Sequence, residues 1–384
     1  MAWLSGWAKR RKVTIAASDV EASLFSFPVL IRLSTTSGKT STDVSDIFDD
    51  LGSNNLKIAA TSSDGETQLY VESVYWDDSG EIAELWISVP SISSSVATEL
   101  YLYFDNNEPD NTTYVGVVGS IPGKTVWDSN FVLVMHLAET SGSYLDSTFF
   151  GNSSASVGVT SRTTTGLITP NCPEVEFDNT DTGIIVLNDT SLQLTDHTLE
   201  ALINFESFSD DFPKIINRND GAGGWYGLEQ TNLPTEMRHR WASSGLGLGY
   251  NDFASSISTG NWDYLAGTIN SSTLVEVSYW NDNAPDSYSS VNAPTAGGST
   301  LLRILGDGAQ PLDATGDEIR ISKIARPQSW IRATHKTMND NFITWSATEI
   351  GGWQHKVNTV SVSPGYKINT VDSIDIAAVD DVTV

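Results

Sequence analysis

The chain has 384 residues, and its 48 acidic against 21 basic residues give a net charge of −27, which repels phosphate backbones and excludes a nucleic-acid partner. Hydrophobic residues make up 39% and charged residues only 18%, with 30 Gly and 13 Pro, a composition that favours short strands joined by turns over helices. No run approaches the ~18 apolar residues of a membrane span, so we expect no membrane insertion; the single cysteine, Cys172, excludes an internal disulfide framework.

Residues 1–120 are predicted to form a first β-sandwich. Its expected strands are residues 13–15, 27–33, 56–59, 68–76, 83–89 and 100–104. A turn signal, Ser62-Ser63-Asp64-Gly65, separates two of them. Six short strands at regular spacing are typical of a sandwich. The stretch 105–124, rich in Asn, Pro and Gly, is interpreted as a linker.

Residues 121–350 are predicted to form a second, larger β-sandwich. Its expected strands include residues 132–137, 198–205, 263–269, 274–280 and 317–322. A short helix is expected from Pro327 to His335, because proline is favoured in the first turn of a helix. The predicted fold class is therefore all-β, two sandwiches in tandem followed by a short C-terminal β-tail.

The tail, residues 351–384, contains the repeat Lys-Val-Asn-Thr-Val at 356–360 and Lys-Ile-Asn-Thr-Val at 367–371. Two such short segments cannot bury a core of their own. We expect the tail to be ordered by contact with another copy or with a different protein, which makes a homo-oligomer the predicted state. A floppy tail, or one docked on its own sandwich, is the alternative.

Two family resemblances follow from ordered motifs. The first module contains W-A-K-R-R-K-V-T-I, F-P-V-L-I-R-L, E-S-V-Y-W, W-I-S-V-P and Y-L-Y-F-D-N-N, and it resembles an uncharacterised domain family of bacterial, archaeal and phage surface proteins. The second module contains V-M-H-L-A-E at 134–139, Y-L-D-S-T-F-F-G-N at 144–152, V-E-F-D-N-T-D at 175–181 and D-E-I-R-I-S-K-I-A-R-P at 317–327, and it resembles the laminin-G-like, concanavalin A-like lectin jelly rolls. Phe149 and Phe150 stand where that family has glycine.

The second resemblance implies a structural calcium ion. In that family a cation often joins the early Asp-Ser-Thr loop to the late Asp-Glu strand, which here correspond to Asp146 and Asp317, with Asp178 and Asp181 as outer candidates. The alternative is that Asp146 caps its own turn and that Asp317 only begins a strand beside Arg320.

Aromatic residues in the second module are candidates for stacking on sugar rings. Trp225, Tyr226 and Trp241 follow or lie near the glycine-rich segment 221–224, which suits an exposed loop, and Tyr250 and Trp262 are further aromatic residues of this part of the module. The alternative is that these rings belong to the core of a large sandwich.

Three further groups of residues are assigned structural roles. His136 is expected to be a core histidine, and the basic segment 9–12 is expected to pair with carboxylates of the chain or to contact an acidic face of a partner. Glu174, Glu176 and Asp178 alternate along one strand, as in some jelly-roll glycosidases. The resembling family uses this strand structurally, so no catalytic residue is assigned.

Three functions remain open. The first is a non-catalytic structural and adhesive protein of a virion surface, a tail, fibre or capsid-decoration component, whose partners are a host-surface glycan and other virion proteins. Tandem sandwiches, a repetitive tail and an N-terminus unlike a secretion signal favour it. The second is a cell-surface adhesin or extracellular carbohydrate-binding protein. The third is a glycoside hydrolase.

Overall fold

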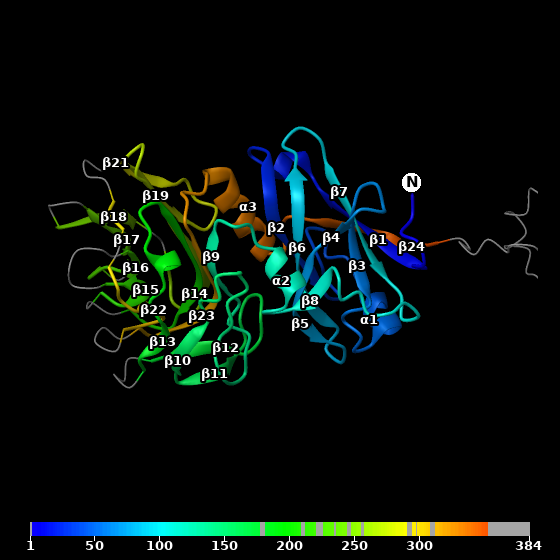
Figure 1. Ribbon diagram of the computed structural model, residues 1–384, viewed down its shortest axis with the longest axis horizontal. Coiled ribbons are helices and arrows are strands. Elements are labelled where there is room, and N and C mark those ends of the chain that lie inside the picture. Colours follow the sequence, from blue (N-terminus) through cyan, green and yellow to red (C-terminus); the bar gives the residue numbers. More distant parts are fainter. Residues whose placement is uncertain are drawn as a thin grey trace, which may run out of the picture. The chain divides into compact units, whose positions relative to one another are not determined.

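The computed structural model describes residues 2–176, 181–208, 212–219, 226–233, 236–243, 247–254, 257–289, 294–296, 298–307 and 312–351. These residues form two β-sandwiches with few helices, as the composition predicted. Figure 1 shows the two sandwiches in blue to cyan and in green to yellow. The tail beyond Gly351, with its repeat, lies outside the described residues.

The first sandwich pairs a five-stranded with a four-stranded sheet. The five-stranded sheet has the order β24 (Thr344–Ile350), β1 (Lys9–Ile15), β7 (Thr98–Phe104), β3 (Ile58–Ser62) and β4 (Gln68–Leu69). The four-stranded sheet has the order β2 (Leu24–Leu33), β6 (Ile82–Ile92), β5 (Val71–Asp77) and β8 (Val115–Val117). Its helical segments are η1 (Ala17–Asp19) and α1 (Asp46–Leu51).

The second sandwich pairs a seven-stranded with an eight-stranded sheet. The seven-stranded sheet has the order β10 (Ser154–Gly158), β13 (Gly183–Val186), β22 (Leu302–Ile304), β15 (Lys214–Arg218), β16 (Tyr226–Gln230), β17 (Glu236–Ser243) and β18 (Gly247–Ala254). The eight-stranded sheet has the order β11 (Ser161–Thr164), β12 (Cys172–Val175), β23 (Ala314–Ser322), β14 (His197–Phe205), β19 (Trp262–Asn270), β20 (Val275–Trp280) and β21 (Asp286–Ser289), with β9 (Phe131–Met135) paired to β23. The helical segments α2 (Ile121–Thr125), η2 (Thr190–Leu192) and α3 (Gln328–Met338) complete the fold.

The C-terminal end of the second module returns to the first module. Strand β24 pairs antiparallel with β1, from Lys9 opposite Ile350 to Thr14 opposite Thr344. Residues 344–350 therefore form an edge strand of the first sandwich. The predicted domain boundary, which assigned them to the second module, is wrong for this strand. The predicted linker also contributes to the first sandwich, because β8 pairs in parallel with β5.

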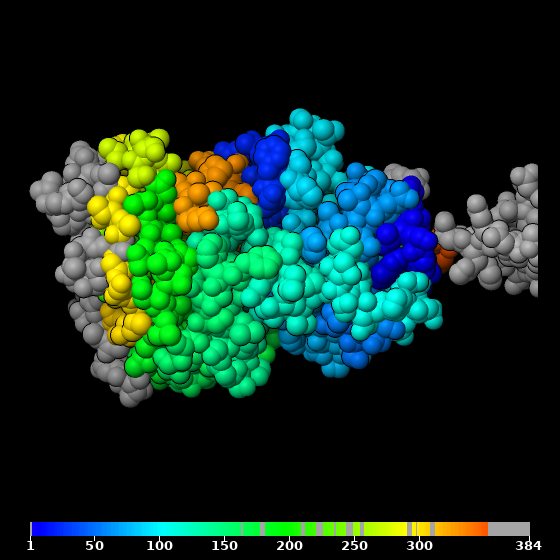
Figure 2. Space-filling model, viewed as in Figure 1, coloured from blue at the N-terminus to red at the C-terminus, as the bar shows by residue number. Residues whose placement is uncertain are grey.

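The central strands of the eight-stranded sheet are buried on both faces. Strand alternation sends Leu265 of β19 into the core between the two sheets of the second sandwich, and its neighbours Tyr264 and Ala266 into the core that continues into the first sandwich. Helix α3, which begins after Pro327 as predicted, covers part of this face: Trp330 lies 4.8 Å from Phe27 of β2, between ring centroids. In Figure 2 the orange segment that holds α3 fills the space between the green and the blue parts of the molecule.

The basic segment 9–12 pairs with carboxylates, which confirms its predicted role. The ion pairs are Lys9–Asp50 at 2.6 Å, Arg10–Glu349 at 2.8 Å, Arg11–Asp46 at 2.5 Å and Lys12–Glu99 at 2.8 Å. Four consecutive cations on β1 are thus neutralised within the first sandwich, partly by the returning strand β24.

Candidate functional site

Asp146, the first predicted calcium ligand, is a buried turn cap. Its carboxylate accepts hydrogen bonds from the backbone N–H of Val134 (3.0 Å), Thr148 (2.9 Å) and Asn152 (2.7 Å), and from the hydroxyl of Thr148 (2.7 Å). Four donors direct positive hydrogens at its two oxygens, and few lone pairs remain for a metal ion. This environment does not fit a cation on Asp146.

Asp317, the second predicted ligand, is fully buried at the junction of β23 with the loop 166–169. It accepts hydrogen bonds from the N–H of Ile168 (2.7 Å) and Thr169 (3.3 Å) and from the Thr169 hydroxyl (3.0 Å). Burial, together with neighbouring Glu318, raises the pKa of Asp317 to about 7. Three N–H and O–H donors already point at this carboxylate, so few lone pairs remain for a cation.

The outer calcium candidates do not complete a site. Asp181 accepts from the hydroxyl of Thr160 at 2.5 Å and from the N–H of Glu176 at 2.9 Å, and Asp178 lies outside the described residues. Within the described ranges no group of three or more His, Cys, Asp or Glu side chains is placed to hold a metal ion. A calcium site on this donor set remains a prediction without structural support.

The predicted stacking residues that the structure describes are buried. Tyr226 of β16 is 1% exposed and donates its hydroxyl to the carbonyl of Leu192 at 3.2 Å, and Trp241 of β17 is 0% exposed. Trp241 lies over Gly249 of β18, which stands directly opposite it and leaves room for the ring. Trp225 lies outside the described residues. Tyr226 and Trp241 therefore fill the core, which was the alternative interpretation.

The outer face of the seven-stranded sheet carries a group of charged and polar side chains instead. We call it the basic face. Its members are Lys214 and Asn217 of β15, Glu229 of β16, Arg238 and Arg240 of β17, Tyr250 and Asp252 of β18, and Arg303 of β22. In one cross-strand row Arg303 lies opposite Asn217, Gly227 separates Asn217 from Arg240, and Arg240 lies opposite Tyr250. Strand alternation turns these residues away from the core that holds Tyr226 and Trp241.

Glu229 organises the cations of the basic face. This buried carboxylate lies 2.5 Å from Lys214 Nζ, 2.9 Å from Arg240 Nη1 and 4.0 Å from Arg238 Nη1. Burial lowers the pKa of Lys214, although Glu229 acts in the opposite direction. Glu229 is thus shared among three cations, and Asp252 adds a second carboxylate beside Arg238.

Tyr250 is the exposed aromatic ring of the basic face. It is 47% exposed, and the guanidinium carbon of Arg238 lies 4.2 Å from its ring centroid. Arg238 is in turn fixed by Asp252, with Nη2 at 2.7 Å from Oδ2. A ring held by a fixed arginine, beside further donors, is an arrangement suited to a flat sugar face with hydroxyl or acidic substituents.

The basic face is the sheet face of the second sandwich that the first module leaves open. The opposite sheet is covered by α3 and by the first sandwich, whereas Figure 1 shows β15, β16, β17 and β18 on the far side of the second sandwich. Ligands of β-sandwiches reach such open faces or the loops at their ends. Within this face Tyr250 is exposed, Arg238 and Arg240 are partly exposed, and Lys214, Asn217 and Glu229 are buried.

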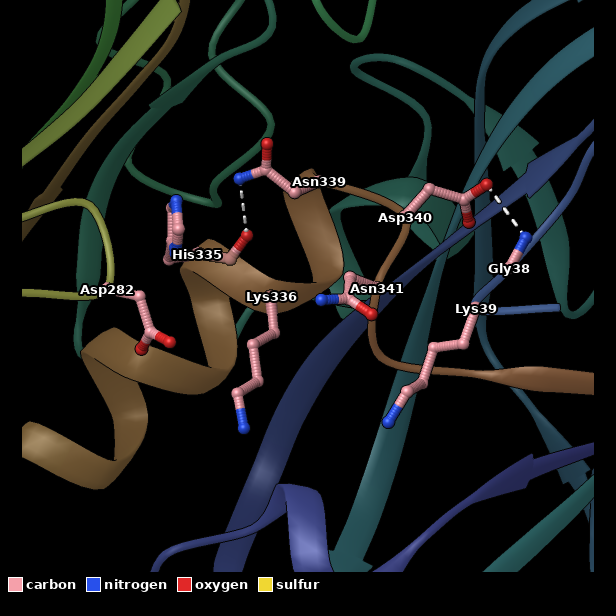
Figure 3. A pocket seen from close by; sticks show the side chains of 8 residues that line it. All are labelled: Gly38, Lys39, Asp282, His335, Lys336, Asn339, Asp340 and Asn341. Atoms are coloured by element: carbon pink, nitrogen blue, oxygen red, sulfur yellow. Dashed lines mark hydrogen bonds between the residues drawn. The ribbon is translucent and has the colours of Figure 1, made fainter. Parts of the chain in front are cut away.

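Two hollows on the described surface are weaker candidates. One of about 470 Å³ lies beside the C-terminal end of α3, lined by Gly38, Lys39, Asp282, His335, Lys336, Asn339, Asp340 and Asn341 (Figure 3). No aromatic ring except that of His335 lines it, and Asp19 lies 2.6 Å from Lys39 Nζ and 3.8 Å from Lys336 Nζ. The other, of about 420 Å³, contains half-exposed Phe150, with Lys323 Nζ 5.3 Å from its ring centroid.

His136 is a structural residue of the junction between the two sandwiches, as predicted. Its Nδ1 lies 2.6 Å from Glu318 of β23, and its Nε2 lies 3.2 Å from Glu72 of β5. Burial opposes protonation, but the two carboxylates outweigh it and raise the pKa of His136 to about 10. The ring is therefore an imidazolium that joins the two modules.

Sequence reasoning noted Tyr250 but missed the charged residues of the basic face, because it searched for aromatic residues. Arg238 and Arg240 alternate with Met237, His239 and Trp241, which signals a strand with one polar face. That pattern could have been recognised. The clustering of β15, β17, β18 and β22 around Glu229 could not, because it depends on strand order.

The family comparison supports the fold assignment of the second module. Residues 178–332 match the concanavalin A-like lectin/glucanases superfamily, a range that contains the whole basic face. No curated protein matches the chain. Among the described residues no helix is long and apolar enough to cross a membrane.

Solved structures similar to the chain include two clostridial toxin domains and a carbohydrate-binding module. They are the binding domain of Paraclostridial Mosquitocidal Protein 1 (16% identity, TM-score 0.43, 54% of this chain and 52% of that one), the binding domain of Botulinum neurotoxin DC in complex with rat synaptotagmin II (11%, 0.44, 54% and 52%) and Ruminococcus gnavus IT-sialidase CBM40 bound to alpha2,3 sialyllactose (11%, 0.33, 38% and 85%). The chain spans about half the length of the toxin domains. The surface-protein resemblance of the first module stays a prediction. The second module has the concanavalin A-like jelly-roll fold that its motifs indicated.

Proposed function

We propose that the chain is a non-catalytic carbohydrate-binding protein whose second module binds glycans on the basic face. The observation that carries this proposal is the match of residues 178–332 to the lectin/glucanase superfamily. The basic face adds a location, because it combines exposed Tyr250 with the partly exposed arginines Arg238 and Arg240. Sugar hydroxyls accept from such donors, while the ring covers the apolar face of the sugar.

A glycan array probed with the full chain tests the proposal. Tyr250→Ala should weaken binding by roughly tenfold or more, in line with the 1–3 kcal/mol that a stacked ring contributes in other ligands. Tyr288→Ala is the matched control, because Tyr288 of β21 is 46% exposed against 47% for Tyr250 but belongs to the other sheet. Equal effects of the two substitutions, or no glycan bound at all, would overturn the assignment.

Hydrolysis is tested on the same glycans. Glu174 accepts hydrogen bonds from the hydroxyls of Ser161 (2.8 Å) and Thr164 (3.1 Å), which hold it in the sheet, and Asp178 lies outside the described residues. We expect bound glycans to be recovered intact after prolonged incubation. Release of a shortened sugar that Glu174→Gln abolishes would favour a glycoside hydrolase instead.

We propose that this binding serves adhesion at a virion surface, with other virion proteins as partners. Support comes from the tandem sandwiches and the repetitive tail, and from the weak affinity expected of one open sheet face, which many linked copies would strengthen. Mass spectrometry and immunogold labelling of purified particles test this. Finding the protein on cell envelopes and never on particles would favour the cell-surface adhesin.

A further inference from the structure

The buried cations of the described residues follow a rule with one exception. Arg10, Arg11, Lys214, Arg320 and Arg326 are each at most 8% exposed, and each has a carboxylate oxygen within 2.9 Å. Arg218 is 0% exposed, and no described carboxylate lies within 4.0 Å of it. Arg218 is therefore the buried cation that lacks a counter-ion in this part of the chain.

The hydrogen bonds of Arg218 are also incomplete. Its Nη2 donates to the side-chain oxygen of Asn188 at 2.9 Å and to the carbonyl of Gly298, while Nε and Nη1 have no acceptor. A guanidinium has five N–H donors, so three of them are left unused. The ring of Tyr226, 5.9 Å from Cζ, offers only a distant cation–π contact.

This arrangement is costly unless an anion completes it. An unpaired buried charge is destabilising by several kcal/mol, and arginine cannot relieve the cost by losing its proton. A water molecule would satisfy N–H donors but would leave the charge uncompensated. We propose that Arg218 binds the anionic group, carboxylate or sulfate, of an acidic sugar. This inference rests on the proposed glycan binding and adds the class of glycan.

The position of Arg218 permits such a ligand. It is the last residue of β15, and its Nη2 partner Asn188 is exposed, as is the next residue, Asn219. Arg218 itself is buried, but these exposed neighbours place the end of β15 near the surface. Asn217, the residue before it, belongs to the basic face, so alternation directs Arg218 toward the opposite side of the sheet, where Tyr226 lies.

The test compares Arg218→Met with Arg326→Met in the full chain. Arg326 is equally buried but is paired with Asp128 by two contacts of 2.7 Å. The ligands are sialyllactose, a glucuronate oligosaccharide, a sulfated lactose and neutral lactose. For each ligand, the change in melting temperature and the dissociation constant are measured. We expect an acidic sugar to raise the melting temperature of the wild type. Arg218→Met should abolish that shift and weaken affinity at least about tenfold.

The ligand-free melting temperatures separate folding from binding. Arg218→Met should melt no lower than the wild type, because it removes an uncompensated charge, whereas Arg326→Met should melt lower and keep its ligand shift. Arg218→Lys keeps the positive charge but loses the planar guanidinium with its paired N–H donors. This variant should retain part of the rise in melting temperature that an acidic sugar causes. The relative response to carboxylated and sulfated sugars identifies which anion is preferred.

Each outcome bears on one claim. Neutral and acidic glycans bound equally well by the wild type and by Arg218→Met would overturn the inference and leave carbohydrate binding intact. Stabilisation of the wild type, but not of Arg218→Met, by sodium sulfate or acetate without any glycan response would support the anion site and overturn the glycan. If no sugar and no anion has an effect, both proposals are wrong.

Discussion

At the scale of single residues, the buried charges of this protein depend on close partners. His136 joins Glu72 of the first sandwich to Glu318 of the second, and Trp127 and Ser147 donate to Glu72 at 2.6 and 2.7 Å. Arg320 completes the group by donating to Glu318 at 2.9 Å. Every member of this group is fully or almost fully buried. The imidazolium therefore balances charge as well as filling space.

Replacing His136 by Gln should destabilise the protein by about 3 kcal/mol near pH 6, because two buried carboxylates lose a shared cation. The folded-state pKa of about 10 exceeds the unfolded value of about 6.5. The stabilisation is therefore complete below about pH 6.5 and is lost as pH rises toward 10. Denaturant titrations at pH 6, 8 and 9.5 should show that the difference in unfolding free energy between wild type and variant becomes smaller as the pH rises.

His335→Gln is the control for this series. His335 lies on α3, is only partly buried, and makes no ion pair with a described residue. Its replacement should change the free energy of unfolding by less than about 1 kcal/mol, and this difference from the wild type should not become smaller at high pH. A pH-independent loss in His136→Gln would show that packing, not charge, explains the effect.

Asp146 should act as a cap and not as a metal ligand. Asp146→Ala should destabilise the second module by about 2–4 kcal/mol, because four buried donors lose their acceptor. Asp189→Ala, which removes only the exposed cap of η2 on the Ser191 N–H, should cost about 1 kcal/mol or less. Both are measured by denaturant unfolding.

Chelation tests the calcium prediction directly. EDTA should leave the melting temperatures of the wild type and of Asp146→Ala unchanged, because N–H and O–H donors already surround the Asp146 carboxylate. A lower melting temperature in EDTA, restored by calcium, would instead support the cation that the family resemblance implies.

At the scale of elements, β24 is the decisive strand. It closes one edge of the five-stranded sheet by pairing with β1, and it supplies Glu349 to Arg10 and the buried ring of Trp345 to the core. An uncovered β1 would expose a row of unpaired backbone groups and a stretch of cations. The first sandwich therefore depends on residues that follow the second one in sequence.

Two truncations test the role of β24. A chain that ends after Gly351 should melt like the full-length protein, whereas a chain that ends after Ile343 should melt roughly 5–10 °C lower, at about 2–4 °C per kcal/mol lost. Thermal unfolding followed by circular dichroism measures both. Equal melting of the two truncated chains would show that β24 contributes little.

At the scale of the whole molecule, the two sandwiches share a core. Residues of β14 and β19, including Leu202, Tyr264 and Ala266, belong to the same buried cluster as Val29 and Trp86 of the first sandwich. Unfolding one sandwich would expose the outer face of the eight-stranded sheet and the charges around His136. The two modules follow one another in sequence, but the stability of each depends on the other being folded.

Residues 1–351 should therefore unfold in one calorimetric transition, with equal calorimetric and van't Hoff enthalpies. Residues 1–120 alone should show no cooperative transition, since they lack β24, α3 and the outer face of the second sandwich. Two resolved transitions in the longer chain, or a cooperative melt of residues 1–120, would indicate independent domains.

The sequence by itself determined what depends on neighbouring residues. Alternation, turn signals and Pro327 predicted the strands, the all-β class and α3, because side-chain direction and backbone preference are local. Ordered motifs were sufficient to identify the jelly roll. The burial of Tyr226 and Trp241 was left as an alternative, because an aromatic residue suits both a core and a binding face.

Only the tertiary structure decided which distant segments meet. Arg10 and Glu349 are 339 residues apart, and His136 lies 64 and 182 residues from its two glutamates. The covered face of the eight-stranded sheet, the cluster around Glu229 and the lack of a carboxylate beside Arg218 among the described residues all depend on strand order. Strand order is set by the burial of whole sheet faces, a property of the assembled sandwiches that no local pattern contains.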